Sequence, residues 1–93
     1  MKKDEKGAAL FHKILEETPQ EIKTQVDWQF GLADAIYNRL QELGMSKKEL
    51  AQKVGTSPAA VTRWVGGGHN FTLSTLAKIS SVLGMPLISV TGR

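Results

Sequence analysis

The sequence predicts an all-α domain of about five helices, with a helical extension at its N-terminus and a short strand at its C-terminus. Two observations support this fold class. Apolar residues recur at helical spacing in several separate stretches, and capping residues, glycine or proline bound these stretches. The chain has 93 residues and no cysteine, which suits one small core closed by packing rather than by disulfides. We divide it into an extension, residues 1–30, and a domain, residues 31–93.

The first predicted helix covers residues 8–17 and is amphipathic over about three turns. Its apolar positions are Leu10, Phe11, Ile14 and Leu15. His12 falls between the two apolar pairs, and no other metal-ligating residue shares its spacing. We therefore interpret His12 as a surface histidine rather than a metal ligand.

The second predicted helix runs from Pro19 to about residue 43. Thr18 is placed to cap it, and Glu21 would complete a capping box. Gly31 marks the position of a kink or break, and Gly44 ends the helix. The apolar positions that keep a helical period are Val26, Phe30, Ala33, Ile36, Tyr37, Leu40 and Leu43.

The centre of the chain encodes two short helices joined by a tight turn. Ser46 is placed to cap the first helix, and Glu49 can return a bond to the backbone of Ser46. Its apolar positions are Leu50, Ala51 and Val54. Gly55 ends this helix, because glycine accepts a positive φ without a Cβ penalty. Ser57 then caps the second helix, which begins at Pro58 and runs to about residue 65.

The second of these helices has two different faces. Its inward positions are Val61, Trp64 and Val65, which are large and apolar. Its outward positions are Ala59, Thr62 and Arg63. Small residues around one arginine suit contact with a groove, and Ala51 is small where two steeply crossing helices need a close approach. This arrangement is typical of a helix-turn-helix, whose second helix enters the major groove of DNA.

The residues Glu49-Leu-Ala-Gln-Lys-Val-Gly-Thr56, with Val61, Trp64 and Gly67, resemble the helix-turn-helix of the phage repressor and Cro (XRE) family. The resemblance continues through residues 71–79 and Leu83-Gly84, and it covers roughly residues 36–85. It implies a lambda-repressor-like bundle that binds double-stranded DNA and regulates transcription. Two departures concern the site: Lys47 stands where the family often has glutamine, and Pro58-Ala59-Ala60 replaces polar side chains that often read bases.

The remainder of the chain contains a loop, a helix and the predicted strand. Residues 66–71 are glycine-rich and form the loop. Thr72 caps a helix over residues 73–83, which Gly84 ends. The inward positions of that helix are Leu73, Leu76, Ile79 and Leu83. Residues 87–91 are rich in β-branched side chains, so we expect a short strand there, paired with a symmetry mate.

Basic charge is concentrated in the helix-turn-helix half of the chain. Residues 1–42 carry six basic and eight acidic side chains, whereas residues 43–93 carry six basic and one acidic. A positive surface of this kind attracts phosphates, although a solvated lysine face has the same composition. We leave Lys53 and Lys78 as solvated charges.

Several classes of function lack support in the sequence. His12 and His69 lie far apart with no carboxylate at metal-ligand spacing, and the glycine run lacks the Lys-Ser/Thr of a phosphate-binding loop. We therefore expect no enzyme, no cofactor and no metal. No apolar run approaches the roughly 18 residues of a membrane span, and no signal peptide is visible. The absence of cysteine fits a cytoplasmic protein.

The predicted interface has two groups of residues. The base-contact candidates are Ser57, Ala59, Thr62 and Arg63. The phosphate-contact candidates are Ser46, Lys47, Lys48, His69, Asn70 and Thr72. Arg63 is the best base reader because its guanidinium can bond guanine bidentately; the alternative is a surface arginine paired to an acid.

We expect a homodimer, because a single recognition helix of this composition reads few base pairs. Either residues 87–91 or the helix over residues 8–17 could form its interface. One alternative function is a HigA-like antitoxin that binds a toxin through residues 1–30. The other is a protein-interaction module that keeps the fold without binding DNA, which an acidic recognition face would favour.

Overall fold

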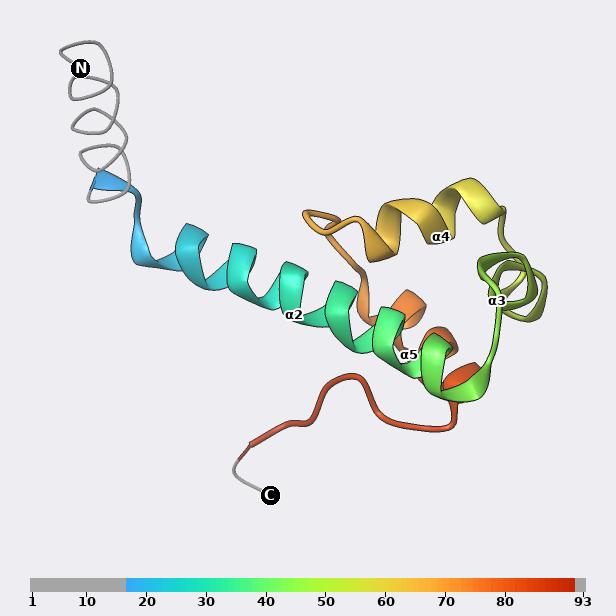
Figure 1. Ribbon diagram of the computed structural model, residues 1–93. Coiled ribbons are helices and arrows are strands. Elements are labelled where there is room, and N and C mark those ends of the chain that lie inside the picture. Colours follow the sequence, from blue (N-terminus) through green and yellow to red (C-terminus); the bar gives the residue numbers. More distant parts are fainter. Residues whose placement is uncertain (1–16, 92–93) are drawn as a thin grey trace, which may run out of the picture.

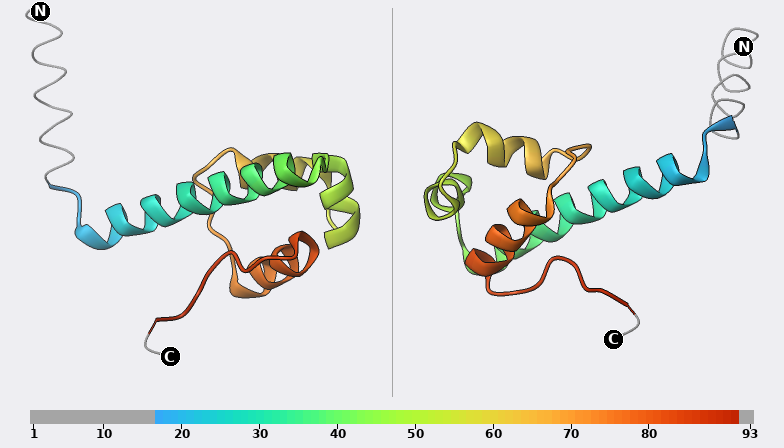
Figure 2. Two further views of the ribbon diagram at one scale, coloured as in Figure 1. Left: turned by 60° about the horizontal axis from the view of Figure 1, so that its bottom comes forward. Right: turned by 180° about the vertical axis from the view of Figure 1, so that it is seen from behind.

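The computed structural model describes residues 17–91, and this part of the chain contains four α-helices and no strand. They are α2 (Gln20–Leu43), α3 (Lys47–Val54), α4 (Pro58–Val65) and α5 (Leu73–Leu83). The second half of α2 packs with α3, α4 and α5, whereas the first half extends beyond them (Figures 1 and 2). The described residues therefore form α-helices joined by irregular segments. The helix predicted over residues 8–17 lies outside the described residues except for Glu17.

Helix α2 differs from the prediction at its start. Its N-cap is Pro19, and no side chain caps the helix, so the predicted capping box of Thr18 and Glu21 is wrong. The backbone carbonyl of Pro19 instead accepts hydrogen bonds from the N–H groups of Ile22 and Lys23, at 3.1 and 3.2 Å. The helix continues through Gly31 without a break. Packing of its second half offsets the roughly 1 kcal/mol that glycine costs in a helix interior.

The local signals of the helix-turn-helix are confirmed. Ser46 Oγ accepts a hydrogen bond from the Glu49 N–H at 3.1 Å, and Glu49 Oε1 accepts one from the Ser46 N–H at 3.4 Å. Gly55 has a φ of 89° and ends α3. Ser57 Oγ accepts from the Ala60 N–H at 3.2 Å, so α4 begins at Pro58 as predicted.

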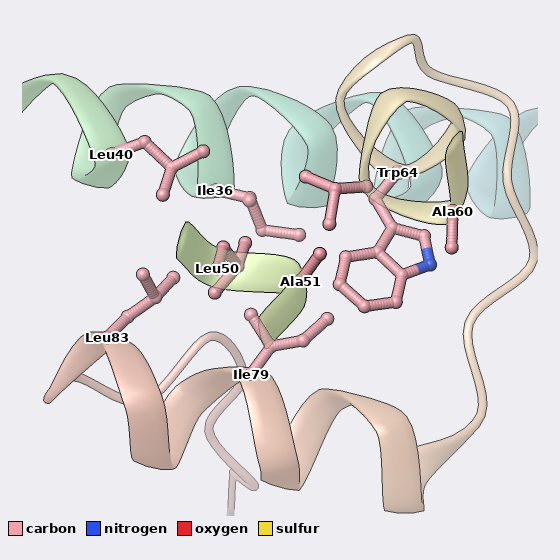
Figure 3. Packing of buried hydrophobic residues seen from close by; sticks show 9 residues of the cluster. Ile36, Leu40, Leu50, Ala51, Ala60, Trp64, Ile79 and Leu83 are labelled. Atoms are coloured by element: carbon pink, nitrogen blue, oxygen red, sulfur yellow. The ribbon is translucent and has the colours of Figure 1, made fainter. Parts of the chain in front are cut away.

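One apolar core joins the four helices. Nine buried side chains form it: Ile36, Leu40, Leu50, Ala51, Ala60, Val61, Trp64, Ile79 and Leu83. The Trp64 ring points into the cluster, toward Ala51 and Ile79 (Figure 3). Arg39 adds a polar link, because its Nε donates to the Leu83 carbonyl oxygen at 3.0 Å and so joins the last turn of α5 to α2.

Leu73, which we predicted to face inward, and several apolar residues that keep the helical period of α2 are exposed. Leu73 is 72% exposed because it is the first residue of α5 and lies outside the core cluster. Val26 and Phe30 are 41% and 50% exposed because they precede the part of α2 that the other helices cover. Leu43, in the last turn of α2, is 43% exposed.

The strand predicted over residues 87–91 is wrong, since the structure assigns no strand there. The Leu87 N–H donates to Ser80 Oγ at 3.1 Å, and the Leu87 side chain packs against the core. The segment that follows α5 is thereby attached to that helix (Figure 2). A strand needs a second strand for its backbone hydrogen bonds, and the described residues provide none.

Candidate nucleic-acid interface

Helix α4 presents the four base-contact candidates on its exposed side. Ser57, Ala59, Thr62 and Arg63 are all exposed, whereas Ala60, Val61 and Trp64 are buried. At about 100° per residue, positions 59, 62 and 63 share one face of the helix. The buried side chains anchor α4 against α2 and α3, so the exposed face is held by a packed core.

Two side chains define the chemistry of this face. Thr62 Oγ1 donates to the Pro58 carbonyl oxygen at 3.1 Å. This bond occupies the hydroxyl proton and leaves the oxygen as an acceptor and the methyl group for apolar contact. Arg63 forms no ion pair with any residue between 17 and 91. Its guanidinium is therefore available as a donor, and the alternative of an arginine paired to an acid finds no partner in that part of the chain.

The start of α3 carries the first group of phosphate-contact candidates. Lys47 and Lys48 are the first two residues of α3, and both are exposed. Ser46 is committed to the capping box, since its Oγ accepts from the Glu49 N–H and also contacts Glu49 Oε1 at 3.4 Å. Lys47 and Lys48 form no ion pair with any residue from 17 to 91, whereas Ser46 mainly fixes the end of the helix that carries them.

The loop between α4 and α5 carries the second group. The rings of His69 and Phe71 meet edge to face with centroids 4.7 Å apart, and Phe71 lies 6.3 Å from the Trp64 ring. Thr72 Oγ1 caps α5 by accepting from the Thr75 N–H at 3.2 Å. Asn70 is exposed between these fixed residues. The loop is therefore tied to the core at Phe71 and to α5 at Thr72.

The structure also brings together residues that the sequence did not connect. Lys53 and Lys78 line one groove of about 470 Å³ between α3 and α5, with Val54 and Val82 beside them. The Phe30 ring lies against Gly67, where an added Cβ would overlap it. No signal in the sequence links these pairs, because their members lie 25 to 37 positions apart and on different elements.

Residues 36–89 match the family HTH_3, described as helix-turn-helix, over more than half of the chain. The chain belongs to this helix-turn-helix family. Membership indicates a DNA-binding regulator of transcription. The matched range begins in α2 and ends beyond α5, so it includes both groups of phosphate-contact candidates.

Solved structures share part of this helix-turn-helix chain. No curated protein sequence matches it. It is similar to the structure of hydroxypropylphosphonic acid epoxidase from S. wedmorenis, with a TM-score of 0.60 and 32% identity, over 63% of this chain and 31% of that one. The Fe(II) form of HppE in complex with substrate gives the same score and identity, and 34% of that chain is covered. The chain therefore spans about a third of the length of these structures.

A helix-turn-helix requires neither a metal site nor a membrane-spanning helix. Among residues 17–91, no group of three or more histidine, cysteine, aspartate or glutamate side chains could hold a metal ion. Within the same range, no helix is long and apolar enough to cross a membrane.

Proposed function

We propose that this chain binds double-stranded DNA sequence-specifically as a homodimer and represses transcription. The observation that carries the proposal is the exposed face of α4, where Arg63 and Thr62 stand on a helix anchored by buried Trp64 and Val61. The excess of basic side chains in residues 43–93 supports the same partner. We also propose that the chain has no enzymatic activity of its own, since its family is one of DNA-binding regulators.

Each candidate residue has a role in this proposal. Arg63 reads guanine through two parallel hydrogen bonds. Thr62 and Ala59 contact thymine methyl groups, and Ser57 lies at the N-terminal end of α4, the end at which recognition helices approach the bases. The remaining candidates bind phosphates: Lys47 and Lys48 from α3, and His69, Asn70 and Thr72 from the loop.

The homodimer follows from the amount of sequence that one helix can read. A good base contact discriminates by about 1–3 kcal/mol, whereas selecting one site in a genome requires roughly 4–10 kcal/mol over non-specific binding. Arg63 is the single strong donor on the face of α4. A two-fold dimer doubles the readout on half-sites about 34 Å apart, one helical turn of DNA.

Selection of bound fragments from random duplex DNA tests sequence-specific binding directly. We expect one enriched palindromic sequence, with the protected length of two half-sites. If no duplex is enriched and none is bound at low salt, the chain is a protein-interaction module without DNA binding. A protected length of one half-site with a monomeric protein at all concentrations would exclude the dimer.

The role of Arg63 is tested on the selected sequence. We expect Arg63→Ala to cost about 1–3 kcal/mol and to relax the preference at one position of each half-site. Lys48→Ala should weaken binding to all sequences alike, because it removes a phosphate contact. Lys53→Ala is the matched control, since Lys53 is also exposed but lies in the last turn of α3. Equal, sequence-independent losses for the Arg63 and Lys48 variants would make Arg63 a phosphate contact.

A second candidate function is that of an antitoxin whose toxin binds residues 1–30. The apolar surface on the first half of α2 favours it, because Ile22 and Val26 are 47% and 41% exposed. Expression of the neighbouring gene alone should then arrest growth, and co-expression of this chain should relieve the arrest. Ile22→Asp with Val26→Asp should lose the relief, whereas Glu21→Ala, on the exposed surface of the same turn, should keep it. Absence of growth arrest would reject the antitoxin role.

A further inference from the structure

The first half of α2 continues the core-facing line of the helix beyond the core. At about 100° per residue, Ile22 and Val26 lie within about 40° of Leu40 around the helix axis. Leu40 is 3% exposed, whereas Ile22 is 47% and Val26 41% exposed. The difference arises because no other described helix reaches the first half of α2, which projects past α4 and α5 in all three views (Figures 1 and 2). This part of α2 therefore has an apolar stripe without a partner among residues 17–91.

The chain itself contains a segment that matches this stripe. Residues 1–16 join the described part at Glu17, directly before Thr18 and Pro19. Residues 8–17 carry the amphipathic pattern formed by Leu10, Phe11, Ile14 and Leu15. A loop of two residues is within the range that connects antiparallel helices in a helical hairpin. Both the length of the segment and its point of attachment thus allow it to return along α2.

The spacing of the apolar residues agrees with such a hairpin. In an antiparallel pair, residues equally far from the turn lie level along the two axes, because both helices rise about 1.5 Å per residue. With the turn at Thr18 and Pro19, Leu15 is level with Ile22, and Phe11 is level with Val26. Each helix therefore presents two large apolar side chains, one turn apart, at matching heights.

We infer that residues 8–17 form a helix that folds back on the first half of α2 and covers Ile22 and Val26 with Leu15 and Phe11. Packing the apolar face of residues 8–17 against the apolar stripe of α2 removes both from water, because each would otherwise leave large apolar side chains exposed. The covalent connection favours the chain's own segment over a second copy, because a short linker holds the segment at an effective concentration in the millimolar range. The interaction extends the core by one helix and does not depend on DNA binding. A toxin that binds Ile22 and Val26 would have to displace this helix.

A cysteine pair tests the inferred contact in the full chain. The natural chain has no cysteine, so Phe11→Cys with Val26→Cys introduces the only pair. Packed facing positions come within the distance that a disulfide spans, and we expect mild oxidation to form a disulfide within one chain. Lys13→Cys with Val26→Cys is the matched control, because position 13 lies on the opposite side of the helix from Phe11 and Leu15, and it should form little disulfide.

The outcome of the oxidation shows whether residues 8–17 of the same chain or a second copy of the chain cover Ile22 and Val26. A disulfide between two chains would show that a second copy covers α2 and would overturn the inference. Equal yields for the two pairs, or no disulfide in either, would overturn it as well. A yield within one chain that stays unchanged on dilution supports it.

Labelling of a single cysteine provides a second measurement that does not require a disulfide. In the Val26→Cys protein, Phe11→Asp should raise the rate of maleimide labelling several-fold, because it removes the cover from position 26. Lys13→Asp introduces the same carboxylate at a position between the apolar pairs and should leave the rate unchanged. Equal rates in the Phe11→Asp and Lys13→Asp proteins would refute the contact. Circular dichroism of each variant confirms that α2 to α5 remain folded.

Discussion

Replacement of Gly67 by alanine should destabilise the fold for two separable reasons. Gly67 has a φ of +85°, a conformation that costs a residue with a Cβ about 1–2 kcal/mol. A Cβ at this position would also overlap the Phe30 ring, with Phe30 Cδ1 only 2.6 Å away. Overpacking a buried site costs about 1–3 kcal/mol, but the Phe30 ring is 50% exposed and can move aside. We therefore expect the low end of that range, and a total loss of about 2–3 kcal/mol in the free energy of unfolding.

Gly68 provides the matched control for this prediction. Its φ is +71°, and an added Cβ would meet nothing within 4 Å. Gly68→Ala should therefore cost only the backbone term of about 1–2 kcal/mol. The difference between the two variants measures the contact between the loop and α2, and urea denaturation gives both values from the shift of the midpoint.

A double-mutant cycle tests whether the Phe30 ring causes the excess cost of Gly67→Ala over Gly68→Ala. In a Phe30→Ala background, Gly67→Ala should lose its excess cost and match Gly68→Ala, because the overlapping ring is gone. Equal losses for Gly67→Ala and Gly68→Ala in the natural background would refute the packing of Phe30 on Gly67. An excess that persists without the ring would show that another neighbour causes it.

Three further predictions concern the salt dependence of DNA binding, the cap of α4 and the burial of leucines on α5. If a dimer neutralises about six phosphates through residues such as Lys47 and Lys48, the logarithm of the DNA-binding constant should fall with log[salt] at a slope of roughly −5. An affinity that does not change in a salt titration would exclude these phosphate contacts. Ser57→Ala should cost about 1 kcal/mol in chemical denaturation, because it removes the cap of α4, whereas Ser57→Gly should cost only a few tenths. Leu76→Ala should cost about 2–5 kcal/mol because Leu76 is buried on α5. Leu73→Ala should change the melting curve little because Leu73 is 72% exposed; comparable losses would contradict this difference in burial.

The interface residues could be proposed from the sequence because the motif places them. Ala59, Thr62 and Arg63 share a face in any helix that begins at Pro58, and the structure shows that this face is exposed. The contacts that restrain them were not predictable. The bond from Thr62 to the Pro58 carbonyl depends on a rotamer, and the packing of His69 on Phe71 depends on the path of the loop. The roles of these residues toward DNA stay predictions, as does the division between residues 1–30 and 31–93.

The sequence by itself determined the local structure of α3, α4 and α5. The caps at Ser46, Ser57 and Thr72 each bond to an N–H three residues away, so the interaction lies within one turn of helix. Gly55 and Gly84 end helices because a left-handed conformation is easiest for glycine. Such short-range rules need no knowledge of the rest of the fold, and they located α3, α4 and α5 with the bounds observed.

Only the tertiary structure decided how far burial extends along each helix. Periodicity shows which face of α2 is apolar, but it does not show that the neighbouring helices cover Ala33, Ile36 and Leu40 and leave Val26 exposed. The same limit explains why Leu73 is exposed, since it lies at the start of α5 and outside the core cluster. It also explains why residues 87–91 form no strand, since no described segment pairs with them although their composition suits one. Burial and strand pairing depend on surfaces contributed by distant parts of the chain, and a local pattern contains no information about where those surfaces end.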